Sequence, residues 1–165
     1  MKNIFLALVL LCANAFGVYK VGDTVADSCY ETLGGGNFCL SHASGMPKVI
    51  INNAGWCPPC NSEMKSLGQT AHSEFNPLAV AFISLSAEGY QRGTKPDQTF
   101  LKSWQEKHNI PFIVAGDFKN FGKEYFSSPA IPNVAVLDGD NKLVWKAIGP
   151  DVSEIYEKVH ELLGD

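Results

Sequence analysis

The chain has 165 residues, 45% of them hydrophobic and 18% charged, and a formal net charge of −4 at pH 7. This length and composition are typical of one globular domain with a hydrophobic core, and they exclude disordered and fibrous classes of protein. The acidic balance and the lack of a dense run of Lys and Arg argue against nucleic acid as a partner.

The first 17 residues have the pattern of a secretory signal peptide. Lys2 supplies a positive charge, residues 4–11 form an apolar run too short to span a bilayer, and small residues follow at positions 13–17. Cleavage after position 15 or 17 leaves a domain over residues 18–165. A buried first strand or helix is the alternative interpretation. We therefore predict an exported, periplasmic or similarly located protein that is soluble after processing.

Cys12 offers another alternative, a lipoprotein signal in which this cysteine is modified. Leu11 disfavours it, because a small residue is expected at that position. Removal of the signal leaves an even number of cysteines, which in an exported chain indicates disulfide pairing. The remaining cysteines are Cys29, Cys39, Cys57 and Cys60.

Residues 28–41 predict a β-hairpin with a glycine turn at 34–36, because glycine adopts the positive φ that such turns require. Cys29 and Cys39 flank this turn asymmetrically, so a disulfide between them needs a diagonal contact or a bulge. A structural disulfide is the main interpretation, and a second redox pair that relays electrons is the alternative.

Strands and helices alternate along the rest of the chain. The predicted strands are 48–51, 78–85, 112–114, 133–137 and 142–148, and the predicted helices are 57–75, 96–108, a turn or two near 118–126, and one from Asp151, which can cap it. This order predicts an α/β fold: a central mixed sheet flanked by helices on both faces and closed by an antiparallel edge.

The segment Gly55-Trp56-Cys57-Pro58-Pro59-Cys60 lies between a predicted buried strand and a predicted helix. The partial positive charge at a helix N-terminus lowers the pKa of a cysteine there, which favours the reactive thiolate. Two residues of spacing bring both sulfurs together. We predict that Cys57, at the exposed end, attacks a disulfide and that Cys60, one turn into the helix, resolves the mixed disulfide.

A zinc site and an inert disulfide are the alternatives for this pair. Zinc needs two further ligands, and neither the spacing of the other cysteines nor the scattered histidines forms a second ligand pair, so no metal is expected. An inert disulfide is disfavoured because so short a loop stabilises the chain little. The histidines are His42, His72, His108 and His160.

These residues resemble the active site of the thioredoxin superfamily, and most closely the TlpA/ResA/DsbE branch of exported bacterial reductases. The resemblance covers nearly all of residues 18–165. It rests on the Trp-Cys-Pro-Pro-Cys motif, on Glu63 three residues later, and on Ile131-Pro132 before an apolar strand. Residues 86–112 are similar to the insertion typical of the branch. The resemblance implies a thioredoxin-like fold, with the N-terminal hairpin and this insertion added before the half that contains the cis-proline.

The resemblance also implies roles for single residues. A cis bond at Pro132 leaves the Ile131 backbone available to an incoming peptide, and Trp56 shields the disulfide while staying partly exposed. Glu63 shares a helical face with Cys60, where it handles protons and raises the thiol pKa by like charge; a solvated helix carboxylate is the alternative.

Ile51 departs from the family pattern. It stands where ordinary thioredoxins have a buried aspartate, six residues before the first cysteine, and Asn52 and Asn53 follow where aromatic residues are usual. The usual proton acceptor of thioredoxin is therefore absent, and we expect the surface that meets the substrate to differ.

The expected function is disulfide reduction outside the cytoplasm, with no cofactor besides the redox-active cysteine pair. The resemblance implies apocytochrome c cysteines as substrate and a membrane-bound electron donor as partner, and it leaves the oligomeric state open. Three alternatives remain: a disulfide oxidase or isomerase of the same fold, a peroxiredoxin-like peroxidase, and a non-enzymatic metal- or haem-handling module. Pro58 and Pro59 favour a reductase, because neither has an N–H to stabilise the thiolate.

Overall fold

The computed structural model describes residues 17–118 and 120–164. Residues 1–16, with most of the predicted signal peptide and Cys12, lie outside the described residues, so the signal and lipoprotein interpretations stay predictions. In the described part of the chain, no helix is both long and apolar enough to cross a membrane.

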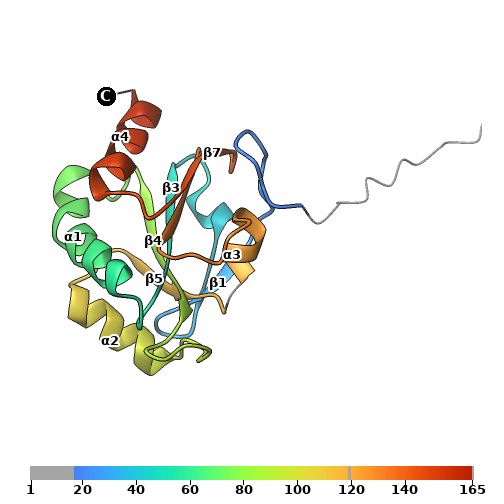
Figure 1. The fold of residues 1–165 in the computed structure, drawn as a ribbon. Coiled ribbons are helices and arrows are strands. Elements are labelled where there is room, and N and C mark those ends of the chain that lie inside the picture. Colours follow the sequence, from blue (N-terminus) through green and yellow to red (C-terminus); the bar gives the residue numbers. More distant parts are fainter. Residues whose placement is uncertain (1–16, 119, 165) are drawn as a thin grey trace, which may run out of the picture.

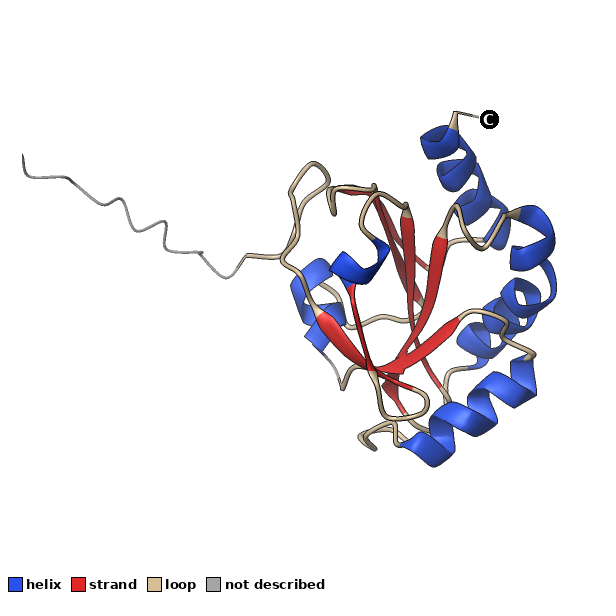
Figure 2. Cartoon of the chain, turned by 180° about the vertical axis from the view of Figure 1, so that it is seen from behind, coloured by secondary structure: helices blue, strands red, loops and turns tan. Residues whose placement is uncertain are grey.

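A seven-stranded mixed sheet, in the order β2-β1-β5-β4-β3-β6-β7, forms the centre of the fold (Figures 1 and 2). The middle strands β3, β4 and β5 are parallel, and the remaining pairs are antiparallel. The strands are β1 (Cys29–Thr32), β2 (Asn37–Cys39), β3 (Lys48–Ala54), β4 (Ala81–Glu88), β5 (Ile113–Gly116), β6 (Asn133–Leu137) and β7 (Leu143–Ile148).

Helices cover both faces of the sheet, as predicted, but unequally (Figure 2). The helices are η1 (Leu40–Ala43), a single 3₁₀ turn, and α1 (Pro58–Glu74), α2 (Gln98–His108), α3 (Asn120–Tyr125) and α4 (Val152–Leu163). Three of them, α1, α2 and α4, pack with Val49 and Ile51 of β3 in one core cluster. The other face packs η1 and α3 with Ile50. Every residue of β3 is buried because both of its faces are covered.

The structure differs from the prediction at the start of β4 and at the cap of α4. Strand β4 begins at Ala81 rather than at residue 78, because Asn76 starts a turn in which its side chain accepts a hydrogen bond from the Leu78 N–H at 2.9 Å. Leu78 is 85% exposed, so its apolar side chain extends the pattern of the strand without belonging to it. Asp151 is the N-cap residue of α4, but its side chain makes no capping hydrogen bond.

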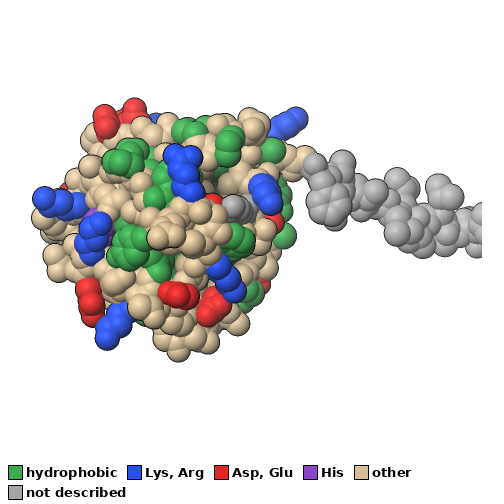
Figure 3. Space-filling view, turned by 60° about the horizontal axis from the view of Figure 1, so that its bottom comes forward, with side chains coloured by type: hydrophobic (Ala, Val, Ile, Leu, Met, Phe, Trp, Pro, Cys, Tyr) green, Lys and Arg blue, Asp and Glu red, His purple; other side chains and the backbone are tan. Residues whose placement is uncertain are grey.

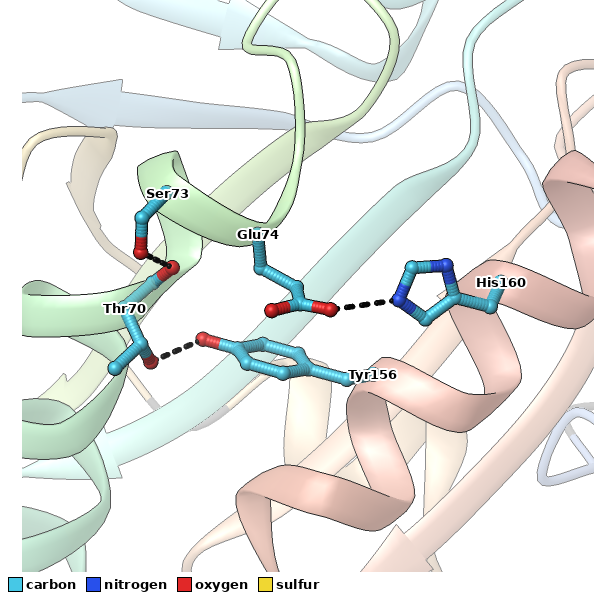
Figure 4. Close-up of polar contacts among 5 residues, drawn as sticks. All are labelled: Thr70, Ser73, Glu74, Tyr156 and His160. Carbon is cyan, nitrogen blue, oxygen red and sulfur yellow. Dashed lines mark hydrogen bonds and ion pairs between the residues drawn. The ribbon is translucent and has the colours of Figure 1, made fainter. Parts of the chain in front are cut away.

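Polar contacts fasten the second half of α1 to α4 (Figure 4). The Thr70 and Tyr156 hydroxyl oxygens are 2.5 Å apart, and Glu74 Oε1 lies 2.9 Å from His160 Nε2. Within α1, Ser73 donates to the Thr70 carbonyl at 2.8 Å. The two contacts with α4 hold α1 at the end remote from its cysteines.

Gly68 lies in the middle of α1, where glycine is unfavourable by helix propensity. A Cβ atom at this position would lie 2.1 Å from the carbonyl oxygen of His108, at the end of α2. The glycine therefore permits the close approach of α1 and α2, which explains its presence in an otherwise regular helix.

Candidate active site

Cys57 and Cys60 form a disulfide at the junction of β3 and α1, with their Cα atoms 5.3 Å apart. Cys57 is the N-cap residue, and its sulfur accepts a hydrogen bond from the Cys60 N–H at 3.2 Å. Pro58 and Pro59 occupy the first two helical positions. The helix start therefore directs one backbone donor, that of Cys60, at the Cys57 sulfur.

Cys57 is less exposed than predicted. Its exposed fraction is 2%, against 0% for Cys60, so exposure alone does not distinguish the two sulfurs. The reason is tertiary: the partly buried side chains of Trp56 and Ile131 pack against the cluster that the two cysteines form with Ala54. The prediction that Trp56 packs on the disulfide while staying partly exposed is confirmed.

The loop before β6 brings a distant part of the chain to the disulfide. The peptide bond between Ile131 and Pro132 is cis, as predicted. The carbonyl oxygen of Ile131 lies 3.7 Å from Cys57 Sγ. A substrate peptide that pairs with the Ile131 backbone would therefore lie beside the Cys57 sulfur. This favours Cys57 as the cysteine that attacks the substrate.

Asn61 was missed in the sequence, although it holds the active-site turn. Its Nδ2 donates to the carbonyl oxygens of Gly55 at 3.2 Å and Cys57 at 2.8 Å, and its Oδ1 accepts from Lys107 Nζ at 2.6 Å. An asparagine in the first turn of a helix is a signal for bonds of this kind to nearby backbone.

Trp56 is held by Glu88, at the carboxyl end of β4, and by Arg92 in the loop that follows, and both residues were also missed. Its Nε1 donates to Glu88 Oε2 at 2.6 Å. The Arg92 guanidinium lies over the indole, 3.9 Å from the ring centroid. The carboxyl ends of parallel strands are where sites gather in α/β folds, and this rule was the available signal.

A groove of about 770 Å³ runs beside the disulfide. Figure 3 views this end of the molecule and shows exposed hydrophobic side chains with charged side chains of both signs around them. Trp56 and Ile131 form the side nearest the sulfurs, and Asn52 and Asn133 lie at the base. Asn53 points elsewhere: it is buried and hydrogen-bonded to Ser84 and Ser86.

Glu63 is buried on the same face of α1 as Cys60, with 7% of its surface exposed. Neither carboxyl oxygen has a hydrogen-bond partner among the described residues. Burial raises the pKa of this carboxyl to about 8. The interpretation as a solvated helix carboxylate is therefore wrong. The like-charge argument also fails at neutral pH in this oxidised form, because Glu63 is then mostly protonated.

Cys29 and Cys39 form the second disulfide, and the predicted asymmetry is wrong. The two residues are direct partners in the β1–β2 register, followed by Tyr30 with Phe38 and Glu31 with Asn37. Residues 32–36 lie between the last of these pairs, so the connection is centred on residue 34 and neither a diagonal contact nor a bulge is needed.

We expect the Cys29–Cys39 disulfide to survive mild reduction that opens Cys57–Cys60. Its closure constrains the β1–β2 hairpin, which is the usual role of a structural disulfide. Peptide mapping after graded treatment with dithiothreitol measures both pairs. Opening of the two pairs at the same reductant concentration would instead support a relay between them.

Among the described residues, no group of three or more His, Cys, Asp or Glu side chains is placed to hold a metal ion. The site therefore consists of the disulfide, the cis-proline loop, the buried carboxyl and the groove. This constellation, on a sheet of this topology, defines a thioredoxin-fold protein with a redox disulfide motif.

Comparison with known proteins assigns the family. The Redoxin family model matches residues 20–162, so the chain belongs to the Redoxin family. It is 24% identical over 166 residues to the thiol-disulfide oxidoreductase ResA of Bacillus cereus, covering 94% of this chain and 91% of that one. It is 34% identical over 86 residues to the soluble secreted antigen MPT53 of Mycobacterium tuberculosis, covering 52% of this chain and 44% of MPT53. The match thus spans less than half the length of that relative.

Solved structures confirm the predicted thioredoxin-like fold. A putative protein disulfide isomerase from Bacteroides thetaiotaomicron superposes with a TM-score of 0.73 at 15% identity, covering 88% of this chain and 91% of that one. A secreted disulfide oxidoreductase of Mycobacterium tuberculosis, homologous to Escherichia coli DsbE, superposes with a TM-score of 0.65 at 23% identity. The match covers 82% of this chain and 96% of that one. The predicted likeness to the TlpA/ResA/DsbE branch is confirmed by these relatives.

Proposed function

We propose that this protein is an exported thiol–disulfide oxidoreductase that reduces protein disulfides with Cys57 and Cys60. The observation that supports this most is the Cys57–Cys60 disulfide at the start of α1, with the Ile131 carbonyl beside the Cys57 sulfur. A thiolate at a helix N-terminus, next to a backbone edge that can pair with a peptide, is an arrangement suited to thiol–disulfide exchange.

The reaction uses two exchange steps. The Cys57 thiolate of the reduced protein attacks one sulfur of the substrate disulfide, which forms a mixed disulfide and releases the first substrate thiolate. The Cys60 thiolate then attacks Cys57 Sγ, closes the Cys57–Cys60 disulfide and releases the second thiolate. Two electrons pass from the cysteine pair to the substrate, and the protons of the two cysteine thiols end on the released thiols. A dithiol donor reverses these steps to reduce the protein.

Glu63 handles the proton of Cys60 in the second step. It is buried on the face of Cys60 with no hydrogen-bond partner among the described residues, and with a pKa of about 8 a minor fraction of it is ionised at neutral pH. In that fraction the carboxylate accepts the Cys60 proton when the thiol becomes the nucleophile. Trp56, Ile131 and Pro132 face the substrate.

Export and the signal peptide are supported by one relative, because MPT53 is named as secreted. ResA is named as a thiol-disulfide oxidoreductase, which supports the activity. The partners are proposed from the family resemblance. The proposed substrate class is apocytochrome c, and the proposed electron donor is a membrane-bound dithiol protein. The proposed reaction involves neither nucleic acid nor a further cofactor.

A single-turnover assay tests the proposal. The protein is reduced, freed of reductant and mixed with a protein disulfide such as that of insulin. We expect two new substrate thiols for each protein molecule. The Cys57–Cys60 disulfide should form at the same rate as these thiols appear. Consumption of hydrogen peroxide without reduction of the protein disulfide would favour a peroxidase instead.

We predict that Glu63→Gln changes how stability depends on pH. Burial raises the Glu63 pKa to about 8, so the native state keeps a proton that the unfolded chain loses above about pH 4.3. The free energy of unfolding of the wild type should therefore fall between about pH 5 and 8 by several kcal/mol, since each unit of pKa shift is about 1.4 kcal/mol. The variant should lack this slope.

Urea unfolding of the oxidised protein at several pH values measures this difference. The control is Glu106→Gln, at an exposed carboxylate of α2. Parallel pH curves for the wild type and Glu63→Gln would show that the carboxyl is ionised in the native state at neutral pH.

A further inference from the structure

Arg92 lies at the groove with its hydrogen-bonding capacity unused. Its guanidinium stacks on Trp56 at 3.9 Å. It makes no hydrogen bond or ion pair with any other residue that the structure describes. A stacked guanidinium keeps its N–H donors in a fixed fork, which matches the two oxygens of a carboxylate.

Two acceptors that lack donors lie buried at the base of the groove. Asn52 and Asn133 are direct partners in the β3–β6 register and are 2% and 0% exposed. The Oδ1 atom of each has no hydrogen-bond partner among the described residues. A buried amide oxygen without a donor is unfavourable, but each of these atoms has almost no surface open to the groove, so Arg92 rather than the asparagines supplies the contact with a ligand.

The charge around the groove favours an anion. Arg92 and Lys123 both line it and are exposed. Glu88, the acidic residue of the lining, accepts the Trp56 N–H. The net charge of the whole chain is −4 and by itself favours cationic partners. A preference for anions would therefore be local to the groove.

From these contacts we propose that the groove binds the acidic segment of a protein substrate that flanks its reacting cysteine. Arg92 binds a side-chain carboxylate of that segment. The groove borders Trp56 and Ile131, so a segment in it lies next to the Cys57 sulfur. This specificity rests on the proposed function and adds a substrate class to it.

The test uses short peptide disulfides that differ only in the residue beside the cysteine: glutamate, glutamine or lysine. Second-order rate constants for their reduction by the reduced protein are measured at low and at high ionic strength. We expect the glutamate peptide to react about tenfold faster than the lysine peptide at low salt, with the ratio falling as salt screens the pair. Arg92→Ala should remove most of this ratio, and Arg92→Lys should keep part of it.

Lys95→Ala is the matched control, because Lys95 is an exposed cation of the same loop outside the groove. It should keep the wild-type ratio. Equal reduction of the three peptides, or a ratio that Arg92→Ala and Lys95→Ala lower equally, would overturn the specificity while leaving the reductase intact. Failure to reduce any peptide would overturn the proposed function, and the specificity with it.

Discussion

Cys57→Ser should lower the single-turnover rate by about a thousandfold or more, because it removes the attacking sulfur itself. Cys60→Ser should behave differently: attack by Cys57 remains, but the resolving thiol is missing, so the mixed disulfide accumulates. The Ile131 carbonyl lies beside the Cys57 sulfur, which is why we assign the attack to this cysteine. Mass spectrometry of alkylated reaction mixtures measures the covalent adduct in each variant.

The Cys29→Ser, Cys39→Ser double variant is the control, since it removes the other disulfide and leaves the active-site pair. It should retain turnover if it folds, and circular dichroism checks the fold. Mixed disulfides in Cys57→Ser but not in Cys60→Ser would mean that the roles of the two cysteines are reversed.

Gly68→Ala should lower the free energy of unfolding by about 3 kcal/mol. Helix propensity alone predicts the opposite, a gain of about 1 kcal/mol. The contact between α1 and α2 decides whether the substitution stabilises or destabilises the protein. The new Cβ would lie 2.1 Å from the His108 carbonyl oxygen, so the two helices would have to separate. Urea unfolding at constant pH with both disulfides intact measures the change.

Ser66→Ala is the matched control: the same new side chain at an exposed position of the same helix. It should change stability by less than about 0.5 kcal/mol. A Gly68→Ala protein as stable as the wild type would show that the two helices can move apart at little cost.

The parts of the fold that follow local patterns could be predicted from the sequence. The bounds of β6 are as predicted, and those of α1 differ from the predicted 57–75 by one residue at each end, because their apolar periodicity has clear ends. The cis bond before Pro132 was also predicted, from the family resemblance. The start of β4 was not predicted correctly, because the exposed Leu78 extends the apolar run of the strand although it does not belong to the core.

The site was only partly predictable, because it is assembled from separate elements. Burial of Cys57 depends on Ile131, more than 70 residues away along the chain. The raised pKa of Glu63 depends on how α1 packs on the sheet, which the spacing of residues does not report. Arg92 and Glu88 act through contacts with Trp56, and no motif relates their positions.

The reduction potential of the Cys57–Cys60 pair tests the central claim most directly. Both residues between the cysteines are prolines, and the Cys60 N–H donates to the Cys57 sulfur at 3.2 Å, so few backbone donors stabilise the thiolate. A less stabilised thiolate makes the pair more reducing. Equilibration against dithiothreitol or glutathione buffers should give a value nearer that of thioredoxin, about −270 mV, than that of DsbA, about −120 mV. A value near −120 mV, on the same scale, would contradict the assignment as a reductase.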